Sequence, residues 1–242
     1  ACLQNKVKTF VFASSVYVYS NKGSFYRITK QAVENLLEEY AQVEGLDYRI
    51  LRYGSLYGPR AQTWNGLRRY IESMVHSGKV TLRSEGQAKR EYIHVHDAAR
   101  LSLEALDPKY KNKIKLIQIT GTWCPNCRDE SHFIVDYLTK NPDPEIAVIC
   151  LAFERKSTQT LINQRLDHYK NNMNIPYEIL YAGVANIDSA SAALPQLSGI
   201  KSFPTLLFLD RNNVIYKIHT GFDGPATSQY TSFVEDFKMT IQ

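Results

Sequence analysis

The sequence predicts an α/β fold organised as two successive domains, residues 1–113 and 114–242. Short apolar runs alternate with amphipathic stretches in both halves, as strands alternate with helices. The segment 107–113 (Asp-Pro-Lys-Tyr-Lys-Asn-Lys) contains proline and charge but no apolar period, which is typical of a boundary. The length of 242 residues is compatible with one large domain or two small ones.

The first half is expected to contain three strands and three helices. Helix 28–43 places Ala32, Val33, Leu36 and Leu37 on one face, and Gly45 ends it. Residues 20–25 are polar and predict a loop, and residues 53–60 are rich in turn formers. The other predicted elements are strands at 7–12, 48–51 and 91–95, an extended stretch at 79–83, and helices at 66–77 and 97–106.

The second half repeats the alternation. The run 146–153 is the most apolar strand of the chain, and 205–209 with 214–219 predicts a hairpin across a polar turn. The remaining predicted elements are strands at 114–119 and 178–182 and helices at about 124–139, 157–173 and 227–240.

Composition excludes several classes of protein. Hydrophobic residues make up 44% of the chain, with 16 Tyr and 10 Phe, which is too many for a disordered protein. The chain has no apolar run of membrane-spanning length. Its first residues lack the charged and apolar regions of a signal peptide, and we expect the chain to begin inside a larger gene product. Residues 1–113 carry a net charge of +7 and residues 114–242 carry −2. The positive half is either a solvated surface or a site for phosphate-bearing ligands. Nucleic acid is not an expected partner, because no dense basic cluster with interleaved aromatics occurs.

The sequence Cys124-Pro-Asn-Cys127 follows an apolar strand and opens a helix. A thiol at a helix N-terminus meets free backbone N–H groups and the positive end of the helix dipole, which favour the thiolate. Cys124 is therefore the candidate nucleophile toward a substrate disulfide, and Cys127 the candidate resolving thiol. Zinc would need a second ligand pair, and none lies nearby, so no metal is expected. Such a dithiol site requires no cofactor.

The motifs Gly-Thr-Trp-Cys-Pro-Asn-Cys at 121–127 and Gly-Ile-Lys-Ser-Phe-Pro-Thr at 199–205, followed by the hairpin, resemble the TlpA/ResA-like thioredoxin-fold thiol-disulfide oxidoreductases. The resemblance implies a thioredoxin fold over 114–242 that acts on protein or small-molecule disulfides. It also implies a cis Pro204 beside the cysteines and a Trp123 that is available to partners.

The resemblance further implies that Glu130 tunes the dithiol, although an ordinary acidic residue in the first helical turn is an equal alternative. One departure concerns Gln118, which stands where many thioredoxins have a buried Asp as proton acceptor, so that proton route is in doubt. Cys150, in the middle of an apolar strand, is expected to be an inert core residue rather than a redox partner.

Tyr26 and Lys30 lie four residues apart, on one helix face, where an ammonium favours ionisation of a nearby phenol. With Ser15 after a strand, and the motifs 52–60 and 90–97, this series resembles the second half of extended short-chain dehydrogenase/reductases, the NAD-dependent epimerase/dehydratase family. The resemblance implies that Ser15 polarises the substrate, Tyr26 is the acid/base and Lys30 binds the nicotinamide ribose. Arg90 would grip a nucleotide-sugar diphosphate, the alternative being a surface ion pair with Glu91 or Asp97.

This half departs strongly from that family. The Gly-rich loop that cradles the pyrophosphate is absent, so NAD is expected only if the reductase-like half is completed by other sequence. Ser15 and Tyr26 are also closer than the family usually places them. A chimera or an incomplete chain would explain both departures. His94 and His96 alternate on a strand, and two histidines alone do not predict a metal site.

Three functions follow from these patterns. The first is a thiol-disulfide oxidoreductase fused to a truncated Rossmann-like fragment, and the second is a nucleotide-sugar epimerase or dehydratase without its cofactor half. The third is a non-catalytic interaction protein. The first is expected outside the cytoplasm, in the periplasm for example, and the second inside it.

Overall fold

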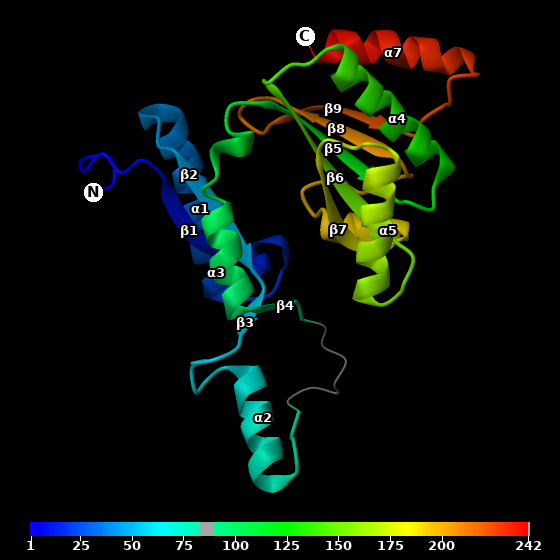
Figure 1. The fold of residues 1–242 in the computed structure, drawn as a ribbon. Helices are drawn as coiled ribbons and strands as arrows, with labels where there is room; N and C mark the ends of the chain where they lie inside the picture. Colours follow the sequence, from blue (N-terminus) through cyan, green and yellow to red (C-terminus); the bar gives the residue numbers. More distant parts are fainter. Residues whose placement is uncertain (83–89, 242) are drawn as a thin grey trace. The chain divides into compact units, whose positions relative to one another are not determined.

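The computed structural model describes residues 1–82 and 90–241, and the chain folds as two compact units, Ala1–Pro108 and Lys109–Gln242. Helices and strands alternate along both units (Figure 1). The predicted α/β class is therefore confirmed.

The N-terminal unit contains two small parallel sheets. Strand β1 pairs with β2, and helix α1 provides the crossover that a parallel pair requires. Strand β3 pairs in parallel with β4. In chain order the elements are β1 (Phe10–Ser15), the 3-10 helix η1 (Val16–Tyr19), α1 (Ser24–Glu44), β2 (Tyr48–Tyr53), β3 (Ser55–Tyr57), α2 (Gly66–Ser77), β4 (Tyr92–His94) and α3 (Val95–Glu104).

The first strand was predicted at 7–12, three residues too early, because β1 spans Phe10–Ser15. Its ladder with β2 starts at Phe10, opposite Tyr48, and continues to Ser15. Residues 1–7 instead close on themselves through backbone hydrogen bonds such as that from Val7 N to Cys2 O at 3.0 Å. Val7 therefore lies outside this ladder, although it belongs to the apolar run.

Two further boundaries were wrong. Helix α1 begins at Ser24, inside the predicted loop 20–25, because Gly23 adopts a φ of 95° that few residues other than glycine tolerate. Part of the predicted turn 53–60 forms β3, whose backbone pairs with β4. The predicted extended stretch 79–83 contains no strand over 79–82, and residue 83 lies outside the described residues.

The C-terminal unit is built on one five-stranded sheet with the order β7-β6-β5-β8-β9. Strands β5, β6 and β7 are parallel, whereas β8 and β9 form an antiparallel hairpin beside β5. This arrangement, with a helix after each parallel strand and a last helix after the hairpin, is the thioredoxin fold. The elements are β5 (Ile114–Thr120), α4 (Pro125–Lys140), β6 (Ile146–Glu154), α5 (Gln159–Asn172), β7 (Glu178–Val184), α6 (Ile187–Ala193), β8 (Thr205–Leu209), β9 (Ile215–Thr220) and α7 (Ser228–Thr240).

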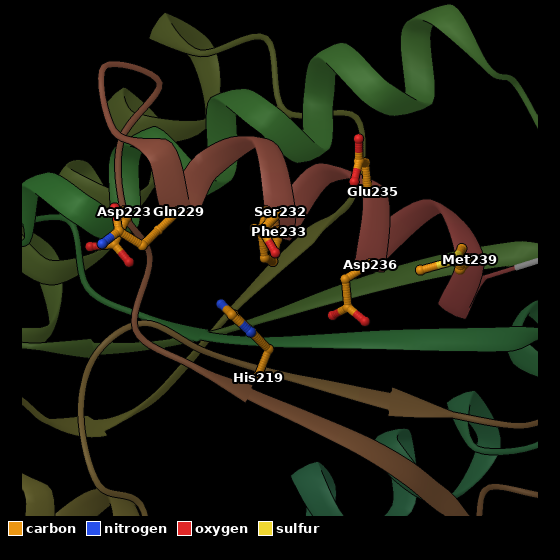
Figure 2. A pocket seen from close by; sticks show the side chains of 8 residues that line it. All are labelled: His219, Asp223, Gln229, Ser232, Phe233, Glu235, Asp236 and Met239. Atoms are coloured by element: carbon orange, nitrogen blue, oxygen red, sulfur yellow. The ribbon is translucent and has the colours of Figure 1, made fainter.

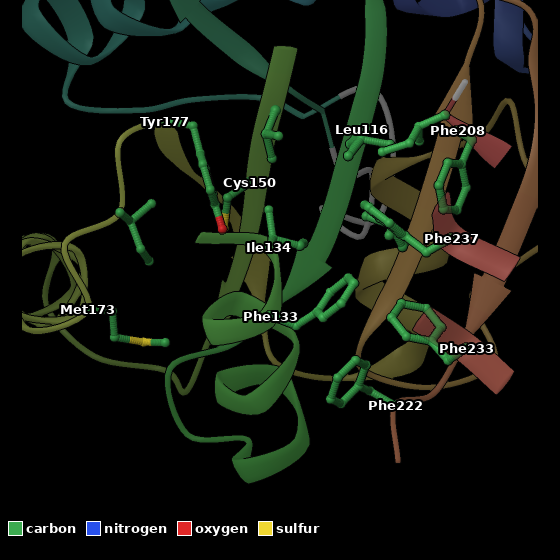
Figure 3. Close-up of a cluster of buried hydrophobic side chains, with 14 of the residues drawn as sticks. Leu116, Phe133, Ile134, Cys150, Met173, Tyr177, Phe208, Phe222, Phe233 and Phe237 are labelled. Carbon is green, nitrogen blue, oxygen red and sulfur yellow. The ribbon is translucent and has the colours of Figure 1, made fainter. Parts of the chain in front are cut away.

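Two apolar clusters cover the two faces of this sheet. On one face, Phe133 of α4 and Phe233 and Phe237 of α7 pack over Leu116 and Phe208 (Figure 3). On the other face, residues of α6 and of the loop before β8 pack over alternate residues of the central strands. Side chains alternate between the two faces along a strand, so Gln118, two residues after Leu116 on β5, points toward α4 as Leu116 does.

Helix α6 was not predicted. Its sequence, Ile-Asp-Ser-Ala-Ser-Ala-Ala, has no amphipathic period, and its N-cap, Asn186, accepts a hydrogen bond from the backbone N–H of Ser189 at 2.6 Å. Capping by Asn fixes the start of a helix too short for periodicity to reveal.

Candidate functional site

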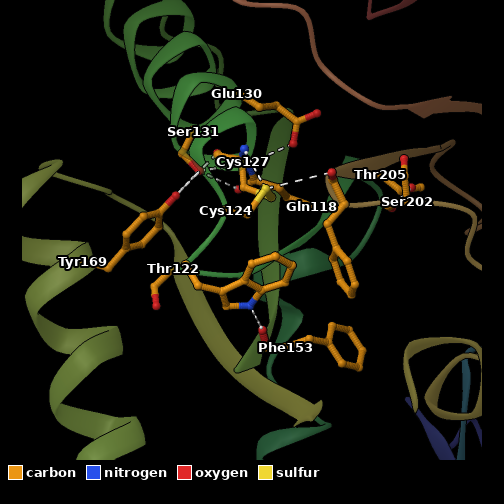
Figure 4. The surroundings of a disulfide bond; sticks show 12 residues. Gln118, Thr122, Cys124, Cys127, Glu130, Ser131, Phe153, Tyr169, Ser202 and Thr205 are labelled. Atoms are coloured by element: carbon orange, nitrogen blue, oxygen red, sulfur yellow. Dashed lines mark hydrogen bonds between the residues drawn. A yellow bond between two sulfur atoms is a disulfide. The ribbon is translucent and has the colours of Figure 1, made fainter. Parts of the chain in front are cut away.

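Cys124 and Cys127 form a disulfide at the N-terminus of α4 (Figure 4). Cys124 is the N-cap residue, and its Sγ accepts a hydrogen bond from the backbone N–H of Cys127 at 3.2 Å. Pro125 occupies the first turn, where a missing N–H costs no helical hydrogen bond. The Cα atoms are 5.2 Å apart, a usual separation for a disulfide.

The two sulfur-bearing residues differ in accessibility. Cys124 is 6% exposed, and Cys127 is completely buried. Cys124 is therefore the less buried of the two, and an external thiol or disulfide is expected to meet it rather than Cys127. When the disulfide opens, the N-cap position gives Cys124 the backbone N–H and the helix dipole that stabilise a thiolate.

The loop before β8 lies against the dithiol. Ile119 of β5 pairs with Thr205 of β8, which brings the start of β8 beside the end of β5. The Phe203–Pro204 peptide bond is cis, and Phe203 O lies 3.9 Å from Cys124 Sγ. The structure thus brings Pro204 close to the dithiol, and its catalytic role stays a prediction.

Trp123 connects this loop with the end of β6. Its Nε1 donates a hydrogen bond to Phe153 O at 2.9 Å, and its ring meets the Phe203 ring edge-on, with centroids 5.6 Å apart. The indole is half-buried rather than a free surface aromatic. The hydrogen bond to Phe153 and the ring contact with Phe203 hold the indole in place beside Cys124.

Replacing Gly121 with Ala is expected to dislodge Trp123. The added Cβ would lie 2.3 Å from Trp123 Nε1 and 2.7 Å from Phe153 O, which is closer than such atoms can come. We expect a loss of about 1–3 kcal/mol in the free energy of unfolding, as in other overpacked sites. The measurement is urea denaturation followed by Trp123 fluorescence in a Trp64→Phe background. Gly66→Ala, where a Cβ meets open space, is the control. Unchanged stability and emission in Gly121→Ala would contradict this packing.

Glu130 is completely buried on α4, one helical turn beyond Cys127. Burial raises the pKa of its carboxyl to about 8, against a smaller opposing effect of the hydrogen bond from Gln118. Gln118 Nε2 donates to Glu130 Oε2 at 2.9 Å. Complete burial and a raised pKa are unusual for an ordinary acidic residue near a helix start, which was the alternative for Glu130. Its role in tuning the dithiol stays a prediction.

A network of buried hydroxyls orients the Gln118 amide. Gln118 Nε2 also donates to Ser131 Oγ at 3.0 Å, and Tyr177 OH donates to Gln118 Oε1 at 3.3 Å. Tyr169 OH donates to Ser131 Oγ at 2.8 Å and approaches Cys127 O at 3.4 Å. Burial raises the pKa of Tyr169 to about 12, so its hydroxyl stays protonated. The amide therefore keeps its Nε2 toward Glu130.

The departure at Gln118 has a structural consequence. An amide in this position cannot take up a proton, whereas the buried carboxyl that it contacts can. The buried group in this network that can carry a proton is therefore the Glu130 carboxyl of α4 rather than the Gln118 amide of β5.

Cys150 is completely buried on β6, opposite Gln118 in the β5–β6 ladder. Burial raises the pKa of its thiol, with smaller contributions from the Glu130 and Glu154 charges. Such a thiol stays protonated and unreactive, in keeping with the core role expected for it.

In the N-terminal unit, the predicted site residues gather around Tyr17. The Tyr17 N–H donates to Ser15 Oγ at 3.3 Å, and the Tyr17 ring meets the Tyr26 ring edge-on at 6.2 Å. Arg90 Nη1 donates to Tyr17 OH at 3.4 Å, and Lys30 Nζ lies 5.6 Å from the Tyr26 ring centroid. Tyr17 itself was not predicted, because one Tyr among several in an unbroken run gives no signal of such a role.

Only part of this cluster fits NAD. Tyr26 is 51% exposed, and Lys30 Nζ donates to Ala13 O at 2.7 Å, so both are held at the end of β1. No strand of the described residues is followed by a Gly-rich turn of the kind that cradles a pyrophosphate. The residues therefore fit the nicotinamide end of the cofactor and not its pyrophosphate, and no chemical step is assigned to NAD.

The rings of His94 and His96 lie 4.8 Å apart. Within residues 1–82 and 90–241, no group of three or more His, Cys, Asp or Glu side chains could hold a metal ion. In the same residues, no helix combines the length and apolar character that crossing a membrane requires.

A shallow pocket of about 500 Å³ lies between β9 and α7 (Figure 2). His219 lines it and packs on the Phe233 ring with centroids 4.6 Å apart, and burial lowers the pKa of this imidazole. Asp236, also in the lining, accepts a hydrogen bond from Lys217 at 2.5 Å. None of the dithiol residues lines this pocket.

Residues 1–118 match the NAD dependent epimerase/dehydratase family. An uncharacterized UDP-glucose epimerase of Bacillus subtilis is 30% identical over 112 residues, which are 41% of this chain and 35% of that protein. A UDP-glucuronate 4-epimerase of Thermodesulfobacterium geofontis is 26% identical over 42% of this chain and 36% of that protein. The chain thus spans about a third of the length of these relatives.

Solved structures similar to this chain include a thioredoxin family thiol:disulfide interchange protein from Chlorobium tepidum (18% identity, TM-score 0.39), covering 55% of this chain and 83% of that one. StoA from Bacillus subtilis has 16% identity and a TM-score of 0.38, covering 53% of this chain and 84% of that one. Residues 1–118 are thus similar in sequence to the NAD dependent epimerase/dehydratase family, and the C-terminal unit, by its own topology, has the thioredoxin fold.

Proposed function

We propose that the C-terminal unit is a thiol-disulfide oxidoreductase. The observation that carries this proposal is a disulfide at a helix N-cap in which Cys124 keeps a small exposed area and Cys127 is completely buried. That asymmetry assigns the exchange with substrate to Cys124 and its resolution to Cys127.

In the reducing direction, the Cys124 thiolate attacks one sulfur of a substrate disulfide, which forms a mixed disulfide and releases one substrate thiolate. Cys127 then loses its proton and attacks Cys124 Sγ, which releases the second substrate thiolate. The substrate disulfide is reduced to two thiols, and the protein dithiol is oxidised to the disulfide seen here. The opposite direction reverses each bond change.

Glu130 is proposed to hold the proton of this exchange. A carboxyl with a pKa of about 8 is close to half-protonated in mildly alkaline solution, so it can accept a proton from Cys127 or return one. Gln118 keeps the carboxyl in place. Its burial, its place one helical turn beyond Cys127 and its raised pKa support this role.

The test is catalysed reduction of insulin, with dithiothreitol as the reductant. The full chain should accelerate the reaction, and Cys150→Ser should be as active as the unchanged protein, because the buried Cys150 takes no part. A rate no greater than that of dithiothreitol alone would contradict the proposal.

For the N-terminal unit we propose a part of a nucleotide-sugar epimerase or dehydratase site. Two observations favour it: Ser15, Tyr26 and Arg90 contact Tyr17 while Lys30 lies over the Tyr26 ring, and residues 1–118 match the family. Sugar and diphosphate contacts would then fall to Ser15 and Arg90.

This chain by itself is expected not to bind NAD tightly. The described residues supply the nicotinamide side and no cradle for the pyrophosphate, which carries much of the binding energy in such sites. Isothermal titration with NAD should give no saturable binding below about 1 mM. Stoichiometric binding in the micromolar range would show that other residues replace the cradle.

A further inference from the structure

The end of β6 places a guanidinium against the aromatic ring beside the dithiol. Because β5 and β6 pair in parallel up to Thr120 and Ala152, the residues that follow each strand run side by side. Arg155 is exposed, and its Cζ lies 5.9 Å from the centroid of the Trp123 ring. A cation over an indole face is a favourable arrangement.

The carboxylate next to Arg155 in sequence does not neutralise it. Glu154 is 1% exposed and turns inward, where its two oxygens accept hydrogen bonds from Thr122 N at 2.7 Å and Thr122 Oγ1 at 2.8 Å. The same two contacts hold the dithiol loop to β6. Consecutive residues at the end of β6 therefore present a negative charge to the interior and a positive charge to solvent.

Trp123 and Phe203 form a chain of contacts between Arg155 and Cys124. The ring that Arg155 covers meets Phe203 edge-on, and Phe203 O is the atom 3.9 Å from Cys124 Sγ. Arg155 is thus connected to the carbonyl beside Cys124 through two ring contacts, and we expect the chain segments that flank a substrate disulfide to come close to it.

Other basic residues lie next to these contacts in sequence. Lys156 follows Arg155, and Lys201 precedes Phe203 by two residues, and both are exposed. In the part of the chain that the structure describes, neither Lys156, Lys201 nor Arg155 forms an ion pair.

We propose that Arg155, supported by Lys156 and Lys201, gives the dithiol a preference for peptides whose disulfide is flanked by Asp or Glu. The proposal rests on the proposed thiol-disulfide exchange and adds the substrate class. Exposed charges at a binding surface act mainly on the rate of association and lose their effect as salt screens them. The preference should therefore appear in kcat/KM and weaken with ionic strength.

The test uses the full chain and two peptide disulfides of the same length, one with Glu and one with Lys beside each Cys. Rates are expressed relative to neutral 2-hydroxyethyl disulfide under the same dithiothreitol concentration. We expect kcat/KM to favour the Glu peptide by about tenfold at low salt. Arg155→Glu should abolish or reverse this ratio, and Arg165→Glu, the same charge change at an exposed position of α5, should preserve it.

The outcomes separate the two proposals. Equal rates for both peptides in the unchanged protein, or an unchanged ratio in Arg155→Glu, would overturn the substrate preference while reduction of 2-hydroxyethyl disulfide still supports the oxidoreductase. Failure to reduce any of the three disulfides would overturn the oxidoreductase and the preference with it.

Discussion

Replacing Cys124 with Ser is expected to lower disulfide reduction by more than about 100-fold, because a hydroxyl cannot replace a thiolate nucleophile. Cys127 cannot take over, since it is completely buried. Ser is itself a favourable N-cap, so α4 should keep its first turn and the fold should persist. The measurement is insulin reduction, with circular dichroism as the check on folding.

Cys127→Ser should behave differently from Cys124→Ser. It retains the accessible Cys124 but lacks the thiol that resolves the mixed disulfide, so the variant should accumulate a covalent adduct with substrate. Non-reducing gel electrophoresis and intact mass would detect one adduct per chain, at Cys124. Full activity of Cys124→Ser, or the adduct on another cysteine, would contradict the assigned roles.

Glu130→Gln is expected to change how stability depends on pH. The folded-state pKa of about 8 lies above the ordinary value of 4.5, so the native protein holds a proton that the unfolded chain releases. The stabilisation that depends on this proton is complete below about pH 4.5 and is lost as pH rises toward 8. The fall over this interval is at most about 5 kcal/mol, from 1.36 kcal/mol per pKa unit. Glu130→Gln should remove it.

The measurement compares urea denaturation at pH 5 and pH 8, followed by Trp123 fluorescence in the Trp64→Phe background. Gln can still accept the hydrogen bond from Gln118, so the packing of α4 should survive. A second readout is the pH profile of insulin reduction, which should lose its inflection near pH 8. Parallel stability curves for Glu130→Gln and the unchanged protein would contradict a buried, protonated Glu130.

The dithiol could be predicted from the sequence because its signal is local. A strand, two cysteines three positions apart and a proline in the first helical turn lie within about 15 residues, and they predict the roles proposed for Cys124 and Cys127. The strand pattern likewise predicted the α/β character of both units. Helix α1 was predicted from its period, yet Leu36 on its apolar face is 56% exposed, while Leu37 is buried. Periodicity shows which residues share a face but not what covers that face.

The surroundings of the dithiol could not be predicted in the same way. Tyr169 and Tyr177 reach the site from positions 42 and 50 residues beyond Cys127, through the packing of α5 and the segment before β7. Glu154 reaches Thr122 across the β5–β6 ladder. The burial of Glu154 was indicated in one way by the sequence, since it is a charged residue at the end of the most apolar strand. Whether Glu130 is buried depends on these long-range contacts, which is why two alternatives stayed open for it.

The central claim is that the Cys124–Cys127 pair is a reversible two-electron redox centre. The direct test equilibrates the full chain in dithiothreitol buffers of graded redox ratio, alkylates free thiols and determines their positions by mass spectrometry. The account predicts that Cys124 and Cys127 become alkylated together in one transition, with a tenfold change in the equilibrium constant per about 30 mV. A pair that stays alkylated in every buffer, or a transition that instead involves Cys150 or Cys2, would contradict it.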